Sequence, residues 1–153
     1  MPRISPDTII AEARRWVGTP YRHRAARLGI GVDCVGLIRG VAEATGVRTL
    51  SDAEWKPFET YSRTPNPEKM RQAMELFLEP SDVSAKIIAP DAFVCWLAWR
   101  EHLPMHVGFA AALDGRRTLI HAALPIGQCV DHGFTDEWLS RVNSWWRLPG
   151  VDY

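Results

Sequence analysis

The spacing of apolar residues changes at Asp91, and this change constrains the fold more than any single motif. Upstream, apolar residues recur three and four positions apart, which is typical of helices that bury one face. Helices are predicted over 5–17, 34–45 and 66–79. Downstream, short apolar runs and an Asp114-Gly115 turn signal indicate antiparallel strands. Strands are predicted over 92–99, 105–112, 117–123, 127–130 and 144–148, with a small helix from Thr135.

Helices followed by an antiparallel sheet define an α+β fold. The sequence shows no internal repeat and no linker-like stretch, and 153 residues suffice for one core. We therefore expect residues 1–153 to form a single domain.

A cysteine stands where a loop meets the second predicted helix, in Gly31-Val32-Asp33-Cys34. Asp33 is a favourable N-cap, because its carboxylate can accept hydrogen bonds from free N–H groups of the first turn. Cys34 then lies where the helix dipole favours negative charge, so we expect its thiol to lose a proton more easily than a free thiol. A cysteine that only packs in the core is the alternative for Cys34 taken alone.

Charge and cysteine content exclude several classes of protein. Lys plus Arg and Asp plus Glu number 18 each, which gives no support to binding of nucleic acid or a charged membrane surface. Three cysteines without a CxxC pair argue against a disulfide framework and a structural zinc site. A zinc site from Cys95, His102 and His106 matches no familiar ligand spacing, so we expect neither a metal nor a cofactor.

The stretch from Met1 to Ile10 has no apolar region of signal-peptide length, and no segment is long enough to span a bilayer. We expect synthesis in the cytoplasm without a signal peptide. If the protein acts outside the cell, in a particle or at the cell wall, we expect it to be released by a route that does not use a signal peptide.

Two histidines lie in neighbouring predicted strands, His106 after Met105 and His121 before Ala122. Antiparallel strands can bring such residues side by side. A cysteine nucleophile needs an imidazole to take its proton and a third group to orient that imidazole. Either histidine alone could be a hydrogen-bonded core residue, but both downstream of a helix-start cysteine predict a Cys-His-His site.

Three further histidines are given no catalytic role. His102 and His132 lie in turn-like surroundings and are expected to be solvated. His23 lies in the loop before Cys34, where it could touch a substrate, although a surface position is the simpler expectation.

Four segments together resemble the NlpC family of cell-wall cysteine peptidases, over nearly the whole chain. They are Gly18-Thr19-Pro20-Tyr21, Gly31-Val32-Asp33-Cys34-Val35-Gly36-Leu37, Met105-His106-Val107-Gly108 and Ile120-His121-Ala122. The resemblance implies a papain-like fold, with the cysteine on an N-terminal helix and the histidines on a following antiparallel sheet. The start at Thr19 to His23 and the short chain are most similar to the branch encoded with phage tails and gene transfer agents.

The resemblance also implies an activity. Cys34 would attack an amide bond in the stem peptide of peptidoglycan (murein), typically between γ-linked D-glutamate and the diamino acid. His106 would be the general base and His121 the orienting residue. Tyr21 and Asp33 would lie on the oxyanion and substrate-binding side, with the Cys34 N–H as a further oxyanion donor.

The chain departs from the family pattern in three places. Val35 stands where the family usually has serine, and Pro90-Asp91 stands where it has Gly-Asp. The segment 47–89 matches poorly, so the predicted helix over 66–79 could cover the cleft as a lid or pad the core.

Two other functions remain open at this point. One is a structural tail-tip or hub component that keeps the peptidase fold and has phage-like tail proteins as partners. The other is a Cys-His-His amidase, deamidase or acyltransferase acting on another substrate, because a fold does not specify its chemistry.

Overall fold

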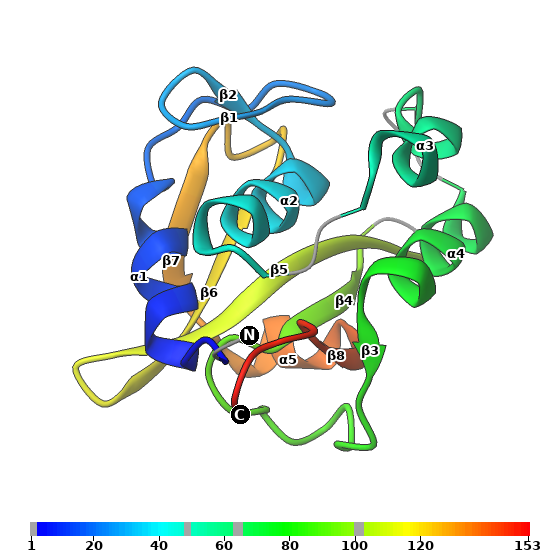
Figure 1. The fold of residues 1–153 in the computed structure, drawn as a ribbon. Helices are drawn as coiled ribbons and strands as arrows, with labels where there is room; N and C mark the ends of the chain where they lie inside the picture. Colours follow the sequence, from blue (N-terminus) through cyan, green and yellow to red (C-terminus); the bar gives the residue numbers. More distant parts are fainter. Residues whose placement is uncertain (1–2, 48–49, 63–65, 100–102) are drawn as a thin grey trace.

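A six-stranded antiparallel sheet forms the centre of the computed structural model, which describes residues 3–47, 50–62, 66–99 and 103–153. The strand order is β3-β8-β4-β5-β6-β7 (Figure 1). The strands are β3 (Glu79–Pro80), β4 (Val94–Ala98), β5 (Pro104–Leu113), β6 (Arg116–Ala122), β7 (Cys129–Gly133) and β8 (Val142–Arg147). This arrangement confirms the predicted α+β class.

Both N-terminal helices begin at the predicted N-caps, and the second also ends where predicted, whereas the first ends at Arg15, two residues before the predicted end at 17. Helix α1 (Pro6–Arg15) is capped by Ser5, whose side chain accepts a hydrogen bond from the Thr8 N–H. Helix α2 (Cys34–Thr45) is capped by Asp33 and ends at Gly46, which has φ 75°. Left-handed backbone of this kind favours glycine and stops a helix.

The strands bury both faces of the sheet. Alternate residues of β4 and β5, such as Trp96 and Phe109, face a core shared with helices α1, α2 and α4 (Pro67–Phe77). The intervening residues, such as Leu97 and Ala110, face a second core that is covered by α5 (Asp136–Ser140). Residues that alternate along a strand point to opposite faces, which explains why these strands read as continuous apolar runs.

Helix α4 is both a core element and a wall of the site described below. Its residues Met70, Met74 and Phe77 are buried in the first core. The helix ends at Phe77, two residues earlier than predicted, because Glu79 and Pro80 pair with β8 as strand β3.

Several elements were not predicted. A hairpin of β1 (Ala26–Arg27) and β2 (Gly31–Val32) leads into α2, and a short helix α3 (Asp52–Trp55) continues into the 3₁₀ turn Lys56–Phe58. Strand β7 begins and ends later than the predicted strand 127–130, which places His132 inside the sheet. Such short elements lack the length over which a period can be recognised.

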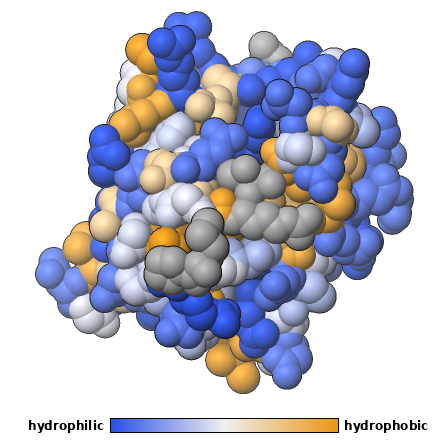
Figure 2. All heavy atoms as spheres, in the orientation of Figure 1, coloured by the Kyte–Doolittle hydropathy of each residue, from blue (hydrophilic) through white to orange (hydrophobic). Residues whose placement is uncertain are grey.

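The outer surface is mostly hydrophilic in the view of Figure 2, with apolar atoms in separate places. None of the helices in the described ranges is both long enough and apolar enough to cross a bilayer.

Candidate active site

Cys34 lies half-buried at the first position of α2, and its sulfur meets strand β5. Backbone N–H groups of Val107, Val35 and Cys34 itself lie against the sulfur. Val107 follows His106 directly, so the thiol and the imidazole are positioned by neighbouring backbone atoms. In the described part of the chain no direct hydrogen bond joins Cys34 to His106, although both line one cavity.

Asp33 is buried beside the thiol and is held by several donors. Its carboxylate accepts from the Gly36 N–H at 2.7 Å, from the Arg24 N–H at 2.7 Å and from the Tyr61 hydroxyl. His23 Nδ1 lies 3.9 Å from the same carboxylate. Asp33 is therefore engaged as a structural acceptor as well as the helix cap.

The loop before α2 can approach Asp33 this closely because residue 36 is glycine. A Cβ atom at Gly36 would lie 1.9 Å from the carbonyl oxygen of Ala25. Arg24 adopts φ 66°, a left-handed conformation that costs a non-glycine residue on the order of 1 kcal/mol. The hydrogen bond from its N–H to Asp33 offsets that cost.

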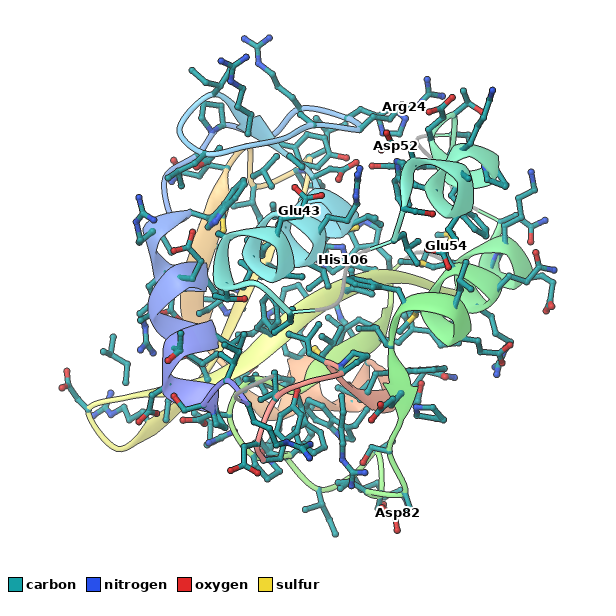
Figure 3. The ribbon with its side chains drawn as sticks, viewed as in Figure 1. Arg24, Glu43, Asp52, Glu54, Asp82 and His106 are labelled. Carbon is teal, nitrogen blue, oxygen red and sulfur yellow. The ribbon has the colours of Figure 1, made fainter. Side chains whose placement is uncertain are left out.

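The same loop fastens the segment that carries α3. Arg24 donates to the carbonyl groups of Tyr61 and Thr60, each at 2.8 Å, and His23 Nε2 lies 2.9 Å from the Tyr61 carbonyl oxygen. In Figure 3, Arg24 extends from its loop toward the α3 segment, and His106 lies beside α2.

Three histidines form a continuous hydrogen-bonded row behind the thiol. His106 Nε2 lies 2.7 Å from His121 Nδ1, and His121 Nε2 lies 2.7 Å from His132 Nε2. His132 Nδ1 lies 2.9 Å from the carbonyl oxygen of Gly133. The predicted pairing of His106 with His121 is therefore present, and His132 extends it.

Aromatic rings pack against this row. The ring of Trp138 packs edge-on against His121 and tilted against His132, with centroids 4.9 and 5.1 Å apart. Trp99 packs on His106 at 4.6 Å. The Arg141 guanidinium stacks on Trp138, 4.5 Å from the ring centroid.

Burial keeps the two inner histidines neutral. Desolvation lowers the pKa of His106 to about 3, and the Arg141 cation acts in the same direction. Desolvation likewise lowers the pKa of His121 to about 2, helped by the neighbouring His106, His132 and Arg141. A neutral imidazole is the form that can accept a proton.

The expectation of an acidified thiol was wrong for this structure. Burial raises the pKa of Cys34 to about 12, and the adjacent Asp33 carboxylate raises it further. The backbone N–H groups around the sulfur act in the expected direction, lowering the pKa, but they are outweighed. The thiol and His106 therefore rest as an uncharged pair.

A cavity of about 580 Å³ opens over Cys34 and His106. Tyr21, Asp33 and Val35 line it on the α2 side, and Met105 and Ala122 line it on the sheet side. The opposite wall comes from the poorly matching segment and comprises Trp55, Pro57, Phe58, Thr60, Tyr61, Ser62, Asn66, Lys69, Met70 and Ala73. A volume of this size suits a small ligand or several residues of a peptide.

Other predicted positions have mixed outcomes. Tyr21 is half-buried and lines the cavity as expected, whereas His132, expected to be solvated, is half-buried in β7 and hydrogen-bonded to His121 of β6. His102 lies outside the described residues. Cys95 is buried, with its thiol 3.5 Å from the Gly108 carbonyl oxygen, and Cys129 is also buried. Within the described residues no three potential metal ligands cluster.

The role of His132 was missed because the predicted strand ended at Val130. The alternation Val130-Asp131-His132 continues the strand and would have placed His132 on the same face as Val130, beside His121. Tyr61 was missed because its surroundings show no periodic pattern.

No family model matches this chain, and no curated protein matches it. Solved structures do resemble it. One is a lipoprotein-like protein of the NLP/P60 family from Staphylococcus aureus, with a TM-score of 0.59 and 18% identity, covering 94% of this chain and 41% of that one. The chain thus spans less than half of the staphylococcal protein.

Two further structures match over nearly their whole length. The NlpC/p60 domain of the peptidoglycan hydrolase SagA has a TM-score of 0.50 and 20% identity, covering 94% of this chain and 98% of its own. An N-acetylmuramoyl-L-alanine amidase from Bacteroides uniformis has a TM-score of 0.54 and 12% identity, covering 92% and 98%. At these identities the likeness establishes the fold, and the chain has the papain-like NlpC/p60 fold predicted from its motifs.

Proposed function

We propose that this chain, which has the NlpC/p60 fold, is a cysteine hydrolase that cleaves amide bonds in peptidoglycan. The observation that carries the proposal is the joint placement of Cys34 and His106 at one cavity, with His121 hydrogen-bonded to His106 from behind. The peptidoglycan-related names of the structural neighbours support the choice of substrate.

The protonation states of the two groups support a proposed order of proton transfer and bond formation. Because the thiol and the imidazole are both neutral, the proton leaves the Cys34 sulfur for His106 as the sulfur bonds to the substrate carbonyl carbon. The negative charge then develops on the carbonyl oxygen, where the Cys34 N–H and the Tyr21 hydroxyl are the proposed donors. His106 returns the proton to the leaving amine, and water hydrolyses the thioester.

The cavity wall fits a peptide that carries carboxylates. Aromatic and aliphatic side chains such as Trp55 and Phe58 supply apolar surface. Asn66 and Lys69 of α4 add an amide and an ammonium group to the same wall. We propose that residues of α2 and β5 catalyse the reaction and that the segment from α3 to α4 binds the substrate.

The finer proposal is an endopeptidase that cuts between γ-linked D-glutamate and the diamino acid, which rests on the resemblance of the motifs alone. The specific alternative is an amidase that cuts the bond between N-acetylmuramic acid and L-alanine, which is favoured by the amidase among the structural neighbours. The two reactions leave different new ends on the fragments.

The test is digestion of purified sacculi by the wild-type protein, Cys34→Ala and the matched variant Cys129→Ala, followed by mass spectrometry of the soluble fragments. We expect fragments from the wild type and Cys129→Ala but none from Cys34→Ala. New diamino-acid amino termini indicate the endopeptidase, and free lactyl groups with L-alanine amino termini indicate the amidase. Equal release by wild type and Cys34→Ala would reject the proposal.

Association with a phage-like tail is a separate proposal, supported only by the likeness of the Thr19 to His23 segment to that branch. It places the protein in a particle or at the wall it opens. Mass spectrometry of purified tail particles tests it. Stoichiometric protein in the particles without fragment release by the purified protein would favour the structural role over the enzymatic one.

A further inference from the structure

The histidine row ends on a group that can only accept a hydrogen bond. His132 Nδ1 lies 2.9 Å from the carbonyl oxygen of Gly133, so this nitrogen must carry the hydrogen. In a neutral His132 the other nitrogen, Nε2, is then a lone-pair acceptor.

The tautomer of each following ring is determined by the ring before it. His121 Nε2 lies 2.7 Å from the His132 acceptor and must donate, which leaves His121 Nδ1 as an acceptor. His106 Nε2 lies 2.7 Å from that acceptor and must donate in turn. The remaining nitrogen of His106, Nδ1, is therefore a lone pair, as a base for the Cys34 proton requires.

The surroundings favour the neutral forms of His106 and His121. Trp99 and Trp138 cover the rings, and the charged group that faces them within the described residues is the Arg141 cation, which disfavours a further positive charge. His121 is fully buried, so water does not compete with His132 for its Nε2–H in the folded protein.

We propose that His132 is a positioning residue for the site, which sets the tautomers of His121 and His106 from the Gly133 carbonyl and so leaves His106 Nδ1 unprotonated. Without an acceptor at position 132, no hydrogen bond favours the His121 tautomer that carries its hydrogen on Nε2. His121 and His106 can then adopt the opposite tautomers. In that tautomer His106 carries a hydrogen on Nδ1, which must be unprotonated to act as a base. The catalytic role of His132 rests on the proposed function, but the assignment of the histidine tautomers does not.

The first test is ¹⁵N NMR of the imidazole nitrogens of the wild-type protein near neutral pH, which distinguishes protonated from unprotonated ring nitrogens. We expect His132 protonated on Nδ1, and His121 and His106 protonated on Nε2. A His106 ring with its hydrogen on Nδ1 would overturn the proposal without any variant being made.

The second test compares His132→Phe with His132→Gln. Phenylalanine fills similar space without an acceptor, whereas the glutamine carboxamide oxygen can still accept from His121. We expect His132→Phe to reverse part of the His121 and His106 tautomers and to lower kcat by about 10-fold or more. His132→Gln should keep both near wild type. Wild-type tautomers and kcat in a folded His132→Phe protein would overturn the proposal.

The control for strand stability is Asp131→Asn, which weakens the 3.0 Å ion pair between Arg14 and Asp131 but leaves the histidine row intact. It should leave tautomers and kcat unchanged. If the wild-type protein released no murein fragments, the proposed function would fail. The NMR result would still decide the inference about the tautomers set by His132.

Discussion

The Tyr61 hydroxyl donates a hydrogen bond to the buried Asp33 carboxylate, which joins the segment carrying α3 to the first turn of the cysteine helix. Burial and the Asp33 charge both raise the pKa of Tyr61, so the phenol stays protonated and remains a donor. This contact fixes one wall of the cavity relative to the thiol.

Tyr61→Phe should loosen that wall. Loss of the donor leaves part of a buried carboxylate unsatisfied, which costs about 1–2 kcal/mol in the free energy of unfolding. We expect lower stability in urea titrations and faster proteolysis within residues 52–62. Tyr153→Phe is the matched control, because it removes a hydroxyl that bonds Ala92 and Leu148 far from this segment. Equal proteolysis of both variants would contradict the assignment.

Asp33→Asn should make Cys34 more acidic. The Asp33 carboxylate raises the pKa of the Cys34 thiol, so a neutral amide removes that contribution while retaining an oxygen that can cap the helix. We expect alkylation of Cys34 by iodoacetamide at pH 8 to be roughly 3- to 10-fold faster. Peptide mass spectrometry separates Cys34 from the buried Cys95 and Cys129.

Asp131→Asn is the charge-matched control for this experiment, because the Asp131 carboxylate raises the pKa of Cys129 and is not among the groups that shift Cys34. An unchanged alkylation profile for Cys34 in Asp33→Asn would show that the Asp33 charge does not act on the thiol.

Acid should destabilise the fold through the histidine row. The pKa of His106 is about 3 and that of His121 about 2 in the folded protein, against an ordinary value of 6.5. As pH falls below 6.5 the unfolded chain binds protons that the folded chain does not, so the free energy of unfolding decreases toward the folded pKa values. Each histidine contributes on the order of 1 kcal/mol per pH unit.

Denaturant titrations at pH 7 and pH 5 measure this slope. A double variant with His106→Gln and His121→Gln should show a smaller loss of stability between the two pH values. An identical loss in wild type and double variant would assign the acid sensitivity to other groups.

Gly108→Ala should disturb the site through packing. A Cβ atom at Gly108 would lie 2.9 Å from Leu119 Cδ1 and 3.0 Å from both His121 Cβ and the Ile120 carbonyl oxygen. We expect destabilisation of about 1–3 kcal/mol and a displaced His121, with weaker His106–His121 hydrogen bonding by NMR. The stability control is Gly133→Ala, where the nearest atom to a Cβ is 4.0 Å away. Equal stability of the two variants would show that the close approach at Gly108 is not required.

Local sequence determined the features of this protein that depend only on interactions between residues close together in the chain. Ser5, Asp33 and Asn66 cap their helices with their own side chains, and Gly46 ends α2 in a left-handed conformation. The Asp114-Gly115 turn also forms where predicted, with φ 51° and 77°. For these reasons the α+β order and the position of Cys34 at a helix start could be predicted.

Tertiary structure alone decided the rest, because it depends on contacts between residues far apart in the chain. Whether the Cys34 pKa rises or falls depends on how deeply the thiol is covered and on Asp33, which outweigh the helix end. The wall around Tyr61 exists because Arg24 and Asp33 bind it across more than 25 residues, and no local pattern encodes that contact. His132 joins His121 only through the register of β7 on β6. Burial and long-range register are properties of the packed chain, so a sequence pattern can name the candidate catalytic groups but not their protonation.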